Sequence, residues 1–306
     1  MKSLIIGFGS IGTRHHEVLS SIGSEVSVLS KRKLEIDRSY VDLNLAMKLE
    51  SPGYIVIANN TDQHIKTFLE IRRLGFKGPI LIEKPLSVDL VETTDESFDE
   101  VYVAYNMRFN PLLDRLKKEI QEEEVLSVVG YAGQYLPLWH EEVDYRTSYS
   151  SIKSKGGGVL RDFSHELDFI SWLFGNWKSV TAIGGKFSSL EIDVEDSFSI
   201  ILDTSLCHSV LLHLNYLERI PRRSLIVNTD KHSYEINFIE KSFKKDADLE
   251  LYKYDRNYSY RLQHEAIIGN NSKDLCTYEL ARETLKLISA IERSSVIEPR
   301  KWINNE

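Results

Sequence analysis

Cysteine is scarce in this sequence, and neither a long apolar run nor an excess of positive charge is present. The only cysteines among the 306 residues are Cys207 and Cys276, too few for a disulfide framework and without a C-x-x-C pair for zinc. No apolar stretch approaches the roughly 18 residues that a membrane-spanning helix needs. The formal net charge is -8, whereas a nucleic-acid-binding surface requires a basic face. We therefore expect neither a membrane nor a nucleic acid as a partner.

The first residues, MKSLIIGFGS, contain a short apolar run that leads directly into glycines. A secretory signal peptide has a longer apolar core, so this start does not resemble one. A cytoplasmic location is the expectation, in keeping with the few cysteines. The length of 306 residues fits two domains, and the 42% hydrophobic and 27% charged content is typical of a folded globular chain.

Residues 1–105 alternate short apolar runs with amphipathic stretches, which is the rhythm of βαβ units and a parallel sheet. The predicted strands are residues 3–7, 25–29, 54–58, 80–83 and 101–105, and the predicted helices include 12–21 and 61–74. This part of the chain is expected to form an α/β domain of its own.

From residue 106 the apolar runs become longer and partly alternating, with few helical patterns between the later ones. The predicted strands are residues 126–135, 179–187, 196–202, 208–216, 223–227 and 234–238, and the predicted helices are 110–122, 165–173 and 275–293. Alternation indicates a mostly antiparallel sheet, so residues 106–306 are expected to form an α+β domain. The helix at 275–293 is a candidate to pack back onto the first domain.

The segment LIIGFGSIG contains a complete G-x-G-x-x-G at Gly7, Gly9 and Gly12, between a predicted strand and a predicted helix. This is the context of the Rossmann dinucleotide-binding motif. The first glycine permits the tight turn, the second lets the backbone approach a pyrophosphate, and the third lets the helix pack close to the sheet. Ser10 and Ile11 lie at the positive helix end, where phosphate binds. A glycine-rich turn without a ligand is the alternative.

The next predicted strand ends in VLSKRK, where an NAD enzyme usually has an acidic residue for the ribose 2′-OH. Ser30, Lys31 and Arg32 stand there instead, and a hydroxyl with two cations suits a 2′-phosphate. NADP is therefore favoured over NAD. A solvated basic loop is the competing interpretation.

The segment GGGVLRDFSHELD places three glycines, residues 156–158, before Asp162, His165 and Asp168. If the segment is helical, the three-residue spacing brings the two carboxylates and the imidazole onto one face. The glycines would then let the backbone run close to a ligand, with the polar side chains entering the same cleft. A tight turn that needs glycine only for its own backbone is the competing explanation.

Three further stretches, ANNTDQH at 58–64, IEKP at 82–85 and YNMRFNP at 105–111, complete a pattern. Together with the two glycine motifs, and over residues 1 to about 175, the chain resembles the Gfo/Idh/MocA oxidoreductase family, which includes glucose-fructose oxidoreductase and inositol dehydrogenase. The resemblance implies an N-terminal Rossmann domain and a C-terminal domain with a large, mostly antiparallel open sheet. It also implies hydride transfer between a nicotinamide and an oxygen-bearing carbon of a sugar, sugar derivative or cyclitol, without a metal.

By this resemblance Lys84, Asp162 and His165 are the catalytic residues. Many family members have D-x-x-x-H where this chain has Asp162-Phe-Ser-His165, so the aspartate and the histidine could exchange roles. Asp168 could hold the imidazole tautomer. Alternatively, Asp162 caps a helix, His165 packs at the surface, and Lys84 is an ordinary surface lysine. The expected cofactor-binding residues are Gly7, Gly9, Ser10, Ile11, Gly12, Ser30, Lys31, Arg32, Asn59, Asn60, Thr61, His64, Glu83, Lys84 and Asn106.

The loop before the second glycine motif combines aromatic rings with charged groups, which suits a polyol ring. The expected substrate-binding residues are Arg108, Tyr135, Trp139, Tyr145, Arg146, Asp162 and His165. His140 belongs to the same loop, and Arg146 or Arg161 could hold a carboxylate or phosphate. This loop resembles a subgroup of bacterial surface-sugar biosynthesis, which favours an activated or acidic sugar; an ordinary surface loop is the alternative. No compact metal-ligand motif is present, so no metal is expected.

The sequence thus predicts an NAD(P)-dependent sugar or cyclitol oxidoreductase. A catalytically silent sensor of the same fold is one alternative, but such a protein should have lost the lysine or the histidine, and the presence of both favours the enzyme. A reductase of an imine or tetrapyrrole is another, which the polar loop favours less. An open apolar sheet in the second domain would leave a large exposed surface, so a homodimer or homotetramer through this sheet is expected.

Overall fold

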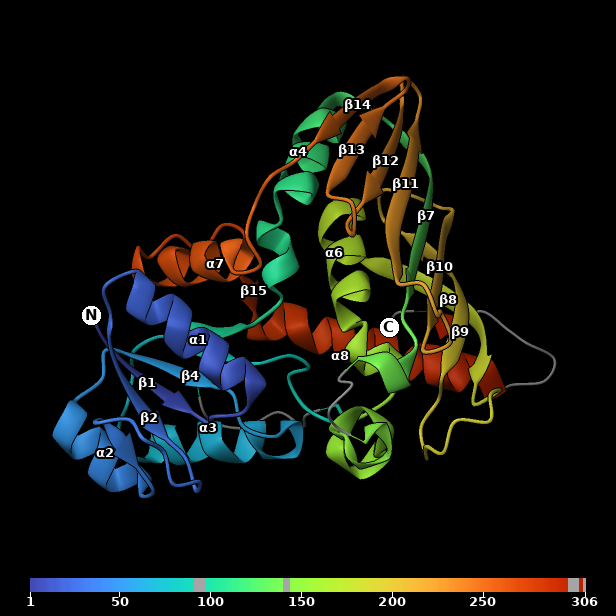
Figure 1. Cartoon of the computed structure of the whole chain (residues 1–306). Coiled ribbons are helices and arrows are strands. Elements are labelled where there is room, and N and C mark those ends of the chain that lie inside the picture. Colours follow the sequence, from blue (N-terminus) through green and yellow to red (C-terminus); the bar gives the residue numbers. More distant parts are fainter. Residues whose placement is uncertain (91–96, 140–143, 297–302, 305–306) are drawn as a thin grey trace. The chain divides into compact units, whose positions relative to one another are not determined.

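The computed structural model describes residues 1–90, 97–139, 144–296 and 303–304 (Figure 1). Contacts divide the chain into two compact units: unit 1 comprises residues 1–109 and 255–282, and unit 2 comprises residues 110–254 and 283–306. The division differs from the predicted one in residues 106–109 and 255–282, which the prediction places in the second domain and which group with the first unit.

The described residues of unit 1 form a seven-stranded sheet in the order β15-β6-β5-β4-β1-β2-β3. Every strand pair is parallel except β15 with β6. Its strands are β1 Lys2–Ile6, β2 Glu25–Leu29, β3 Ser39–Tyr40, β4 Tyr54–Ile57, β5 Ile80–Ile82, β6 Val101–Val103 and β15 Cys276–Thr277. The order 3-2-1-4-5-6 of the parallel strands is that of the doubly wound dinucleotide-binding fold. The predicted N-terminal Rossmann domain is confirmed.

The helices of unit 1 are α1 Ser10–Ser21, α2 Leu43–Glu50, α3 His64–Arg73 and α7 Tyr258–Ile268. Helix α1 buries Gly12, His15, Val18 and Leu19, a spacing of three and four residues that places them on one stripe. Helix α7 was not predicted, and its Ile267 joins Leu19 in the buried core of the unit. That packing explains why residues 255–282 belong to unit 1.

The described residues of unit 2 form a nine-stranded sheet in the order β14-β13-β12-β11-β7-β10-β9-β8-β16. All pairs are antiparallel except β10 with β7. The strands are β7 Val125–Gly133, β8 Trp177–Gly185, β9 Ser197–Thr204, β10 Val210–Asn215, β11 Arg222–Thr229, β12 Ser233–Asn237, β13 Ser242–Lys245, β14 Asp248–Leu251 and β16 Ile303–Asn304. The predicted mostly antiparallel sheet is confirmed.

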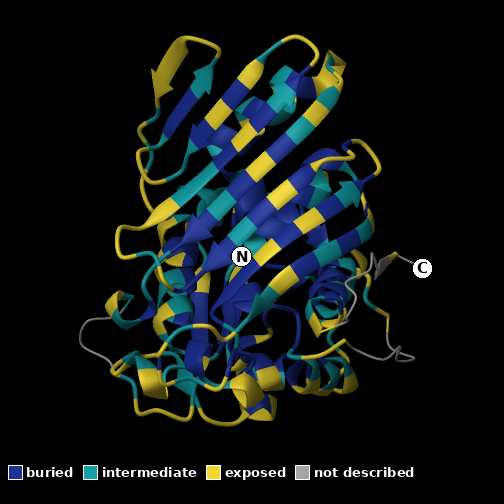
Figure 2. Ribbon diagram, turned by 90° about the vertical axis from the view of Figure 1, so that its right-hand side faces the viewer, coloured by how far each residue is buried: buried dark blue, intermediate teal, exposed yellow. Residues whose placement is uncertain are grey.

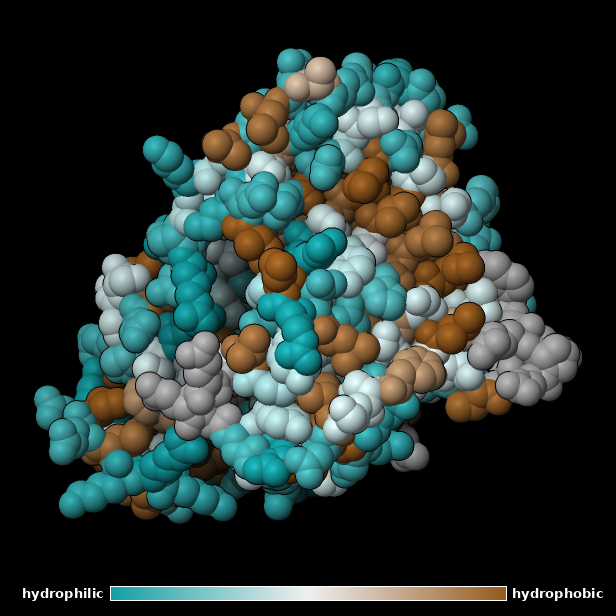
Figure 3. Space-filling model, turned by 45° about the vertical axis from the view of Figure 1, so that its right-hand side comes forward, coloured by the Kyte–Doolittle hydropathy of each residue, from teal (hydrophilic) through white to brown (hydrophobic). Residues whose placement is uncertain are grey.

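One face of this sheet packs on helices and the other is open. The helices of unit 2 are α4 Pro111–Glu119, α5 Val159–Asp162, α6 Ser164–Phe174 and the larger part of α8 Tyr278–Val296. Buried and exposed residues alternate along the strands, and no helix of the described residues covers the face seen in Figure 2. Apolar side chains gather over this sheet in Figure 3. The alternation of buried and exposed residues therefore reflects a sheet with one face covered by helices and the other face uncovered.

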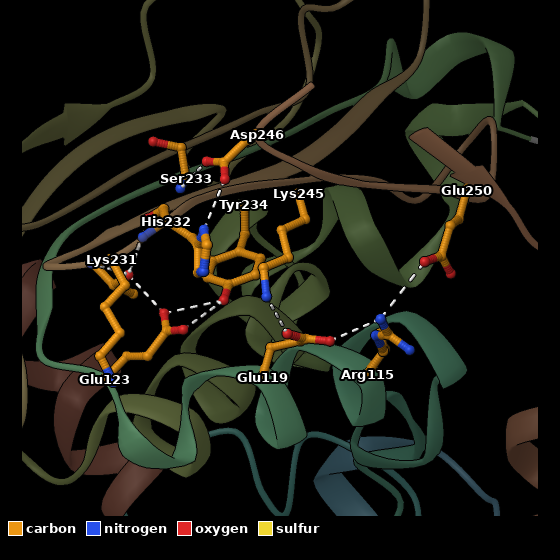
Figure 4. Close-up of polar contacts among 11 residues, drawn as sticks. Arg115, Glu119, Glu123, Lys231, His232, Ser233, Tyr234, Lys245, Asp246 and Glu250 are labelled. Carbon is orange, nitrogen blue, oxygen red and sulfur yellow. Dashed lines mark hydrogen bonds and ion pairs between the residues drawn. The ribbon is translucent and has the colours of Figure 1, made fainter. Parts of the chain in front are cut away.

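A polar cluster joins helix α4 and the turn after it to the strands β12 to β14 (Figure 4). The Tyr234 hydroxyl donates to the Glu123 carboxylate, at 3.0 Å from each oxygen. Lys245 Nζ lies 2.8 Å from Glu119 Oε2, and Arg115 Nη2 lies 2.7 Å from Glu119 Oε1. These contacts fix α4 against the sheet at its β14 end.

Candidate functional site

The parallel strands of unit 1 end at one level, which gathers the residues that follow them at a single edge. The Gly7 N–H donates to the carbonyl of Leu29 at 2.9 Å, the Ala58 N–H to that of Ile6 at 2.8 Å, and the Glu83 N–H to that of Ile57 at 2.8 Å. All the predicted cofactor residues follow the carboxyl ends of β1, β2, β4, β5 and β6. In open α/β sheets ligands bind at this edge, where the strand order reverses beside β1.

The glycine loop has two packing glycines and one glycine that faces open space. Gly7 has φ +100°, and a Cβ on it would lie 2.5 Å from the carbonyl oxygen of Ala58. A Cβ on Gly12 would lie 2.1 Å from the carbonyl oxygen of Gly7, whereas a Cβ on Gly9 would meet nothing within 4 Å. Gly9 precedes α1, whose first N–H groups lack intrahelical acceptors, and Ser10 there is exposed. This arrangement fits the pyrophosphate of a dinucleotide.

Residues 30–32 after β2, which are predicted to bind the 2′-phosphate, include two exposed cationic side chains. The Arg32 N–H donates to Ser30 Oγ at 3.1 Å, which turns the backbone, and the side chains of Lys31 and Arg32 are exposed. Both cations are therefore accessible to an anion at this edge of the sheet.

His64 has a different place from the one predicted for it. The ring is 1% exposed, with Nδ1 3.0 Å from the carbonyl oxygen of Pro85 and Nε2 3.1 Å from that of Asn59. Burial lowers the pKa of His64. Because its nitrogens face backbone carbonyls, His64 ties together the loops after β4 and β5 and does not present a polar atom to a cofactor. Of its neighbours, Thr61 is buried and Asn60 is exposed.

Glu83 is likewise turned inward, contrary to its predicted contact with the cofactor. Its Oε1 lies 2.8 Å from His15 Nε2, and its Oε2 accepts the backbone N–H of Lys84 at 3.0 Å. Lys84 itself is half-buried, and its peptide bond to Pro85 is cis. Glu83 therefore supports the lysine that follows it.

The segment η2 Asn106–Phe109 is held by the C-terminal part of unit 1. Asn106 Nδ2 donates to Ser259 Oγ at 2.8 Å, and Arg108 Nη1 donates to the carbonyl of Leu275 at 3.4 Å. Arg108 was expected to bind substrate from the second domain. It lies in unit 1 and is 5% exposed, so the structure buries it instead.

The condition that one helix carries Asp162, His165 and Asp168 is not met, although the predicted helix 165–173 is present as α6. Asp162 is the last residue of α5, Phe163 separates the helices, and His165 lies in the first turn of α6. His165 and Asp168 share α6 at i, i+3, with His165 half-buried and Asp168 buried. Asp162 is not the residue that caps α6, which is Phe163, so the capping alternative is not supported either.

Other residues of unit 2 occupy the space beside Gly157 and Gly158. A Cβ on Gly157 would lie 2.3 Å from the carbonyl oxygen of Tyr149. Gly158 has φ +115°, and a Cβ on it would lie 2.3 Å from Glu195 Oε1. The competing explanation, that these glycines serve the local backbone and packing, is therefore the one the structure supports. Burial raises the pKa of Glu195 to about 7.

Asp162 is held by a residue that the sequence analysis did not identify. The Tyr216 hydroxyl donates to Asp162 Oδ2 at 2.6 Å, and Tyr216 is fully buried. Trp139 lies edge-on to the Tyr216 ring at 5.3 Å and to Phe163 at 5.7 Å. Burial and the neighbouring Asp162 charge raise the pKa of Tyr216 well above its usual value, so the phenol keeps its proton. The position of Tyr216 after β10 gives no sequence signal for this contact.

The remaining predicted substrate residues lie on the loop of unit 2, and their polar groups are engaged. Arg146 contacts Asp144 at 2.7 Å and Glu191 at 3.0 Å, so its guanidinium is already shared between two carboxylates. The Tyr145 hydroxyl accepts the Glu191 N–H at 3.3 Å, and the Arg219 guanidinium lies 4.1 Å from the centre of the Tyr135 ring. Arg161 Nη1 contacts Glu292 at 2.6 Å. His140 lies outside the described residues.

Lys84 belongs to unit 1, whereas Asp162 and His165 belong to unit 2. The structure thus defines the surroundings of each part of the predicted catalytic set within its own unit. Across the described ranges, no group of three or more His, Cys, Asp or Glu side chains is placed to hold a metal ion. None of the helices in the described part of the chain combines the length and hydropathy of a membrane crossing.

Parts of the chain match a family model and a curated protein. Residues 114–235 match the family model described as GFO/IDH/MocA C-terminal domain. Levoglucosan dehydrogenase of Pseudarthrobacter phenanthrenivorans is 26% identical over 179 residues, which are 55% of this chain and 44% of that protein. The match therefore spans less than half the length of this curated relative.

Two solved structures show the same fold over nearly the whole chain. Levoglucosan dehydrogenase in complex with NADH has a TM-score of 0.84 at 14% identity, covering 99% of this chain and 98% of that one. The WlbA dehydrogenase from Bordetella pertussis, in complex with NADH and UDP-GlcNAcA, has a TM-score of 0.80 at 14% identity, covering 100% and 98%. At such identities the likeness concerns the fold, and it confirms the predicted fold class.

Proposed function

We propose that the chain is an NAD(P)-dependent sugar oxidoreductase. The match of residues 114–235 to the model of the GFO/IDH/MocA C-terminal domain agrees with the predicted resemblance and supports this proposal. The observation that carries the proposal is the edge of the parallel sheet in unit 1. There an open Gly9 precedes α1, and Lys84 follows β5 at the same edge. The names of the relatives, dehydrogenases of sugars in complex with NADH, support it.

The chemistry requires a cofactor that exchanges a hydride and protein groups that manage a proton. A bound nicotinamide would supply or accept the hydride. When a carbonyl is reduced, its oxygen becomes an alkoxide and needs a proton, and the reverse reaction needs a base. In this proposal Lys84 stabilises the charge on that oxygen. His165 exchanges the proton, a task that suits histidine because the unperturbed side chain titrates close to neutral pH. Asp162, fixed by the Tyr216 hydroxyl, orients the imidazole or the substrate hydroxyls.

We infer a preference for NADP from the exposed cations at Lys31 and Arg32 and from the absence of a carboxylate at the end of β2. Separate titrations with NADPH and NADH, followed by nicotinamide fluorescence, test this. Arg32→Glu should weaken NADPH binding by about tenfold or more and leave NADH binding within about twofold, because only NADPH has the 2′-phosphate. Equal affinities for both cofactors in the parent protein would contradict the NADP preference and leave the enzyme class standing.

We propose a sugar with an activating or acidic group as the substrate, in keeping with the UDP-GlcNAcA complex of the WlbA neighbour. A role in bacterial surface-sugar biosynthesis would follow from such a substrate. The test is a turnover screen of phosphorylated, nucleotide-linked and acidic sugars, monitored by nicotinamide absorbance. Tight cofactor binding without turnover of any of these sugars or of cyclitols would favour the sensor alternative instead.

We further propose that the open face of the sheet in unit 2 mediates a homo-oligomer. Ile226, Val129, Leu211 and Ile201 are exposed and lie opposite one another across β11, β7, β10 and β9. This forms a continuous apolar row that a monomer would leave in water. Analytical ultracentrifugation should show a dimer or tetramer at micromolar concentration, and Ile201→Asp should shift it towards monomer. A monomeric parent protein would refute the proposal.

A further inference from the structure

Four buried side chains of unit 1 form a continuous chain of hydrogen bonds that ends at the backbone of Lys84. Tyr54 Oη lies 2.9 Å from His264 Nδ1, and His264 Nε2 lies 2.8 Å from His15 Nδ1. His15 Nε2 lies 2.8 Å from Glu83 Oε1, and Glu83 Oε2 accepts the Lys84 N–H at 3.0 Å. The exposure of Tyr54, His15 and His264 is 0%, and that of Glu83 is 7%.

The chain connects four elements of unit 1 that are distant in sequence: β4, α7, α1 and the end of β5. His15 and His264 are 249 positions apart. Neither histidine has a role in the hydride transfer proposed above. A buried polar group without a partner is costly, so each member of the chain depends on the next.

One arrangement of protons satisfies every contact in the chain. Burial lowers the pKa of His264 well below its usual value, and burial raises that of Tyr54, so both are neutral. Tyr54 then donates to His264 Nδ1, His264 donates from Nε2 to His15 Nδ1, and His15 donates from Nε2 to the Glu83 carboxylate. In this arrangement both imidazoles carry their proton on Nε2, a tautomer that follows from the hydrogen-bond partners.

The buried far end of the chain argues for positioning and against proton conduction. A conducting chain must exchange protons with water, and Tyr54 is fully enclosed. At the other end, the two residues that flank Lys84 are each held by a buried histidine. His15 binds the Glu83 carboxylate, and His64 contacts the carbonyl of Pro85 at 3.0 Å. The backbone of Lys84 is thereby fixed on both sides.

We propose that His15 is a positioning residue for Lys84, acting through the Glu83 carboxylate and oriented in turn by His264 and Tyr54. The catalytic consequence rests on the proposed function, in which Lys84 contacts the reacting oxygen. The hydrogen bonds among Tyr54, His264, His15 and Glu83 do not depend on the proposed function. The ring of Tyr260 lies edge-on to that of His15 at 5.7 Å, and the Arg14 guanidinium lies 5.3 Å from the centre of the Tyr260 ring.

The first experiment reads the tautomers directly in the full chain by long-range ¹H–¹⁵N correlation spectra of the histidine side chains. His264, assigned by single substitution, should show the neutral Nε2–H form, and His15, assigned in the same way, should carry a proton on Nε2. An Nδ1–H tautomer of His264, or a His15 ring without a proton on Nε2, would overturn the proposed hydrogen-bond chain.

The second experiment compares two substitutions that each keep one contact of His15. A glutamine amide reaches the position of Nε2, so His15→Gln retains a donor to Glu83; an asparagine amide reaches that of Nδ1, so His15→Asn retains only the contact with His264. We expect His15→Asn to lower kcat by about tenfold or more with unchanged NADPH affinity, and His15→Gln to stay within about threefold of the parent. His16→Asn, on the neighbouring half-buried histidine, is the matched control.

A third readout, independent of turnover, follows Lys84 after reductive methylation with ¹³C-formaldehyde. The dimethyl-Lys84 resonance, assigned with Lys84→Arg, should shift or broaden in His15→Asn and remain unchanged in His15→Gln and His16→Asn. If His15→Asn unfolds, Tyr54→Phe serves in its place, with a smaller shift of the same resonance expected. An unmoved Lys84 resonance in the folded variants refutes the positioning role. If Lys84→Ala retains turnover, the proposed function fails, and the resonance still decides this inference.

Discussion

The surroundings of Lys84 in unit 1 and of Asp162 in unit 2 differ in how their polar groups are held. Around Lys84, the Glu83 carboxylate has a partner on each oxygen, and the histidine beyond it is itself oriented by a second histidine. Around Asp162, the buried Tyr216 hydroxyl donates to the carboxylate, and the rings of Trp139 and Phe163 lie against that of Tyr216. The nearby Glu195 is buried strongly enough to raise its pKa to about 7.

This difference matches the tasks proposed for the two regions. A lysine that must meet a reacting oxygen loses much of its effect when it is displaced by an ångström, so a fixed backbone is favourable. Residues that contact the variable hydroxyls of a sugar benefit less from a closed network. Functional sites often retain unfavourable features that the rest of the fold supports. The Glu195 carboxyl is such a feature beside the helix that carries Asp162.

The largest expected effect comes from removing the amine on the rigid side of this comparison. Lys84→Ala should lower kcat by about 10³-fold, because it removes the charge that stabilises the alkoxide. The thermal midpoint should change by no more than about 2 °C, since Lys84 is only half-buried. Lys84→Arg keeps the charge but displaces it, so its kcat should lie between those of the parent and of Lys84→Ala. Steady-state kinetics with the sugar found in the screen measure this, and full activity in Lys84→Ala would refute the assignment.

The next effect concerns the backbone that leads to Asp162. Gly158→Ala should lower the free energy of unfolding by about 2–4 kcal/mol, because the added Cβ meets Glu195 Oε1 at 2.3 Å and φ is +115°. Gly185→Ala is the control within unit 2: its φ is +148°, but the nearest atom to its Cβ would lie at 3.9 Å. Urea denaturation of the two variants separates the steric part from the conformational part. Equal losses would show that the contact with Glu195 contributes nothing.

Features that depend on local sequence were the ones that could be predicted. The parallel strands, the glycine loop and the antiparallel sheet follow from runs of apolar residues, from alternation and from glycine spacing over fewer than ten positions. The open space at Gly9 and the exposed cations at Lys31 and Arg32 agree with that reasoning.

Contacts between distant segments could not be predicted in this way. The bond between His15 and His264 spans 249 positions, and the bond from Tyr216 to Asp162 spans 54. Helix α7 has no clear apolar stripe, so its place in unit 1 depends on packing that a local pattern does not encode. The glycine run at 156–158 was ambiguous because a ligand and a neighbouring side chain impose the same need for space.

A smaller effect is expected from removing the hydrogen bond that Tyr216 donates to Asp162. Tyr216→Phe should lower kcat by about tenfold and the free energy of unfolding by about 1–2 kcal/mol, because a buried carboxylate oxygen loses its donor. Tyr234→Phe is a matched control in the same unit, since Tyr234 is also buried and donates to a carboxylate, that of Glu123 (Figure 4). It should lose similar stability and keep full turnover. A similar fall of kcat in both variants would deny Tyr216 a role specific to Asp162.

The smallest effect is a difference in pH dependence that tests the cost of burying Glu195. A carboxyl group whose pKa is raised on folding, here from 4.5 to about 7, stabilises the protein below pH 4.5 and progressively loses that contribution as the pH rises through 7. Glu195→Gln has no charge to gain, so it should be more stable than the parent by about 1–3 kcal/mol at pH 8 and by less than about 1 kcal/mol at pH 5. Glu191→Gln, an exposed carboxyl nearby, should show no such change. Urea denaturation at both pH values measures the difference in the free energy of unfolding. If the parent and Glu195→Gln showed parallel pH profiles, the buried Glu195 carboxylate would not destabilise unit 2 at high pH.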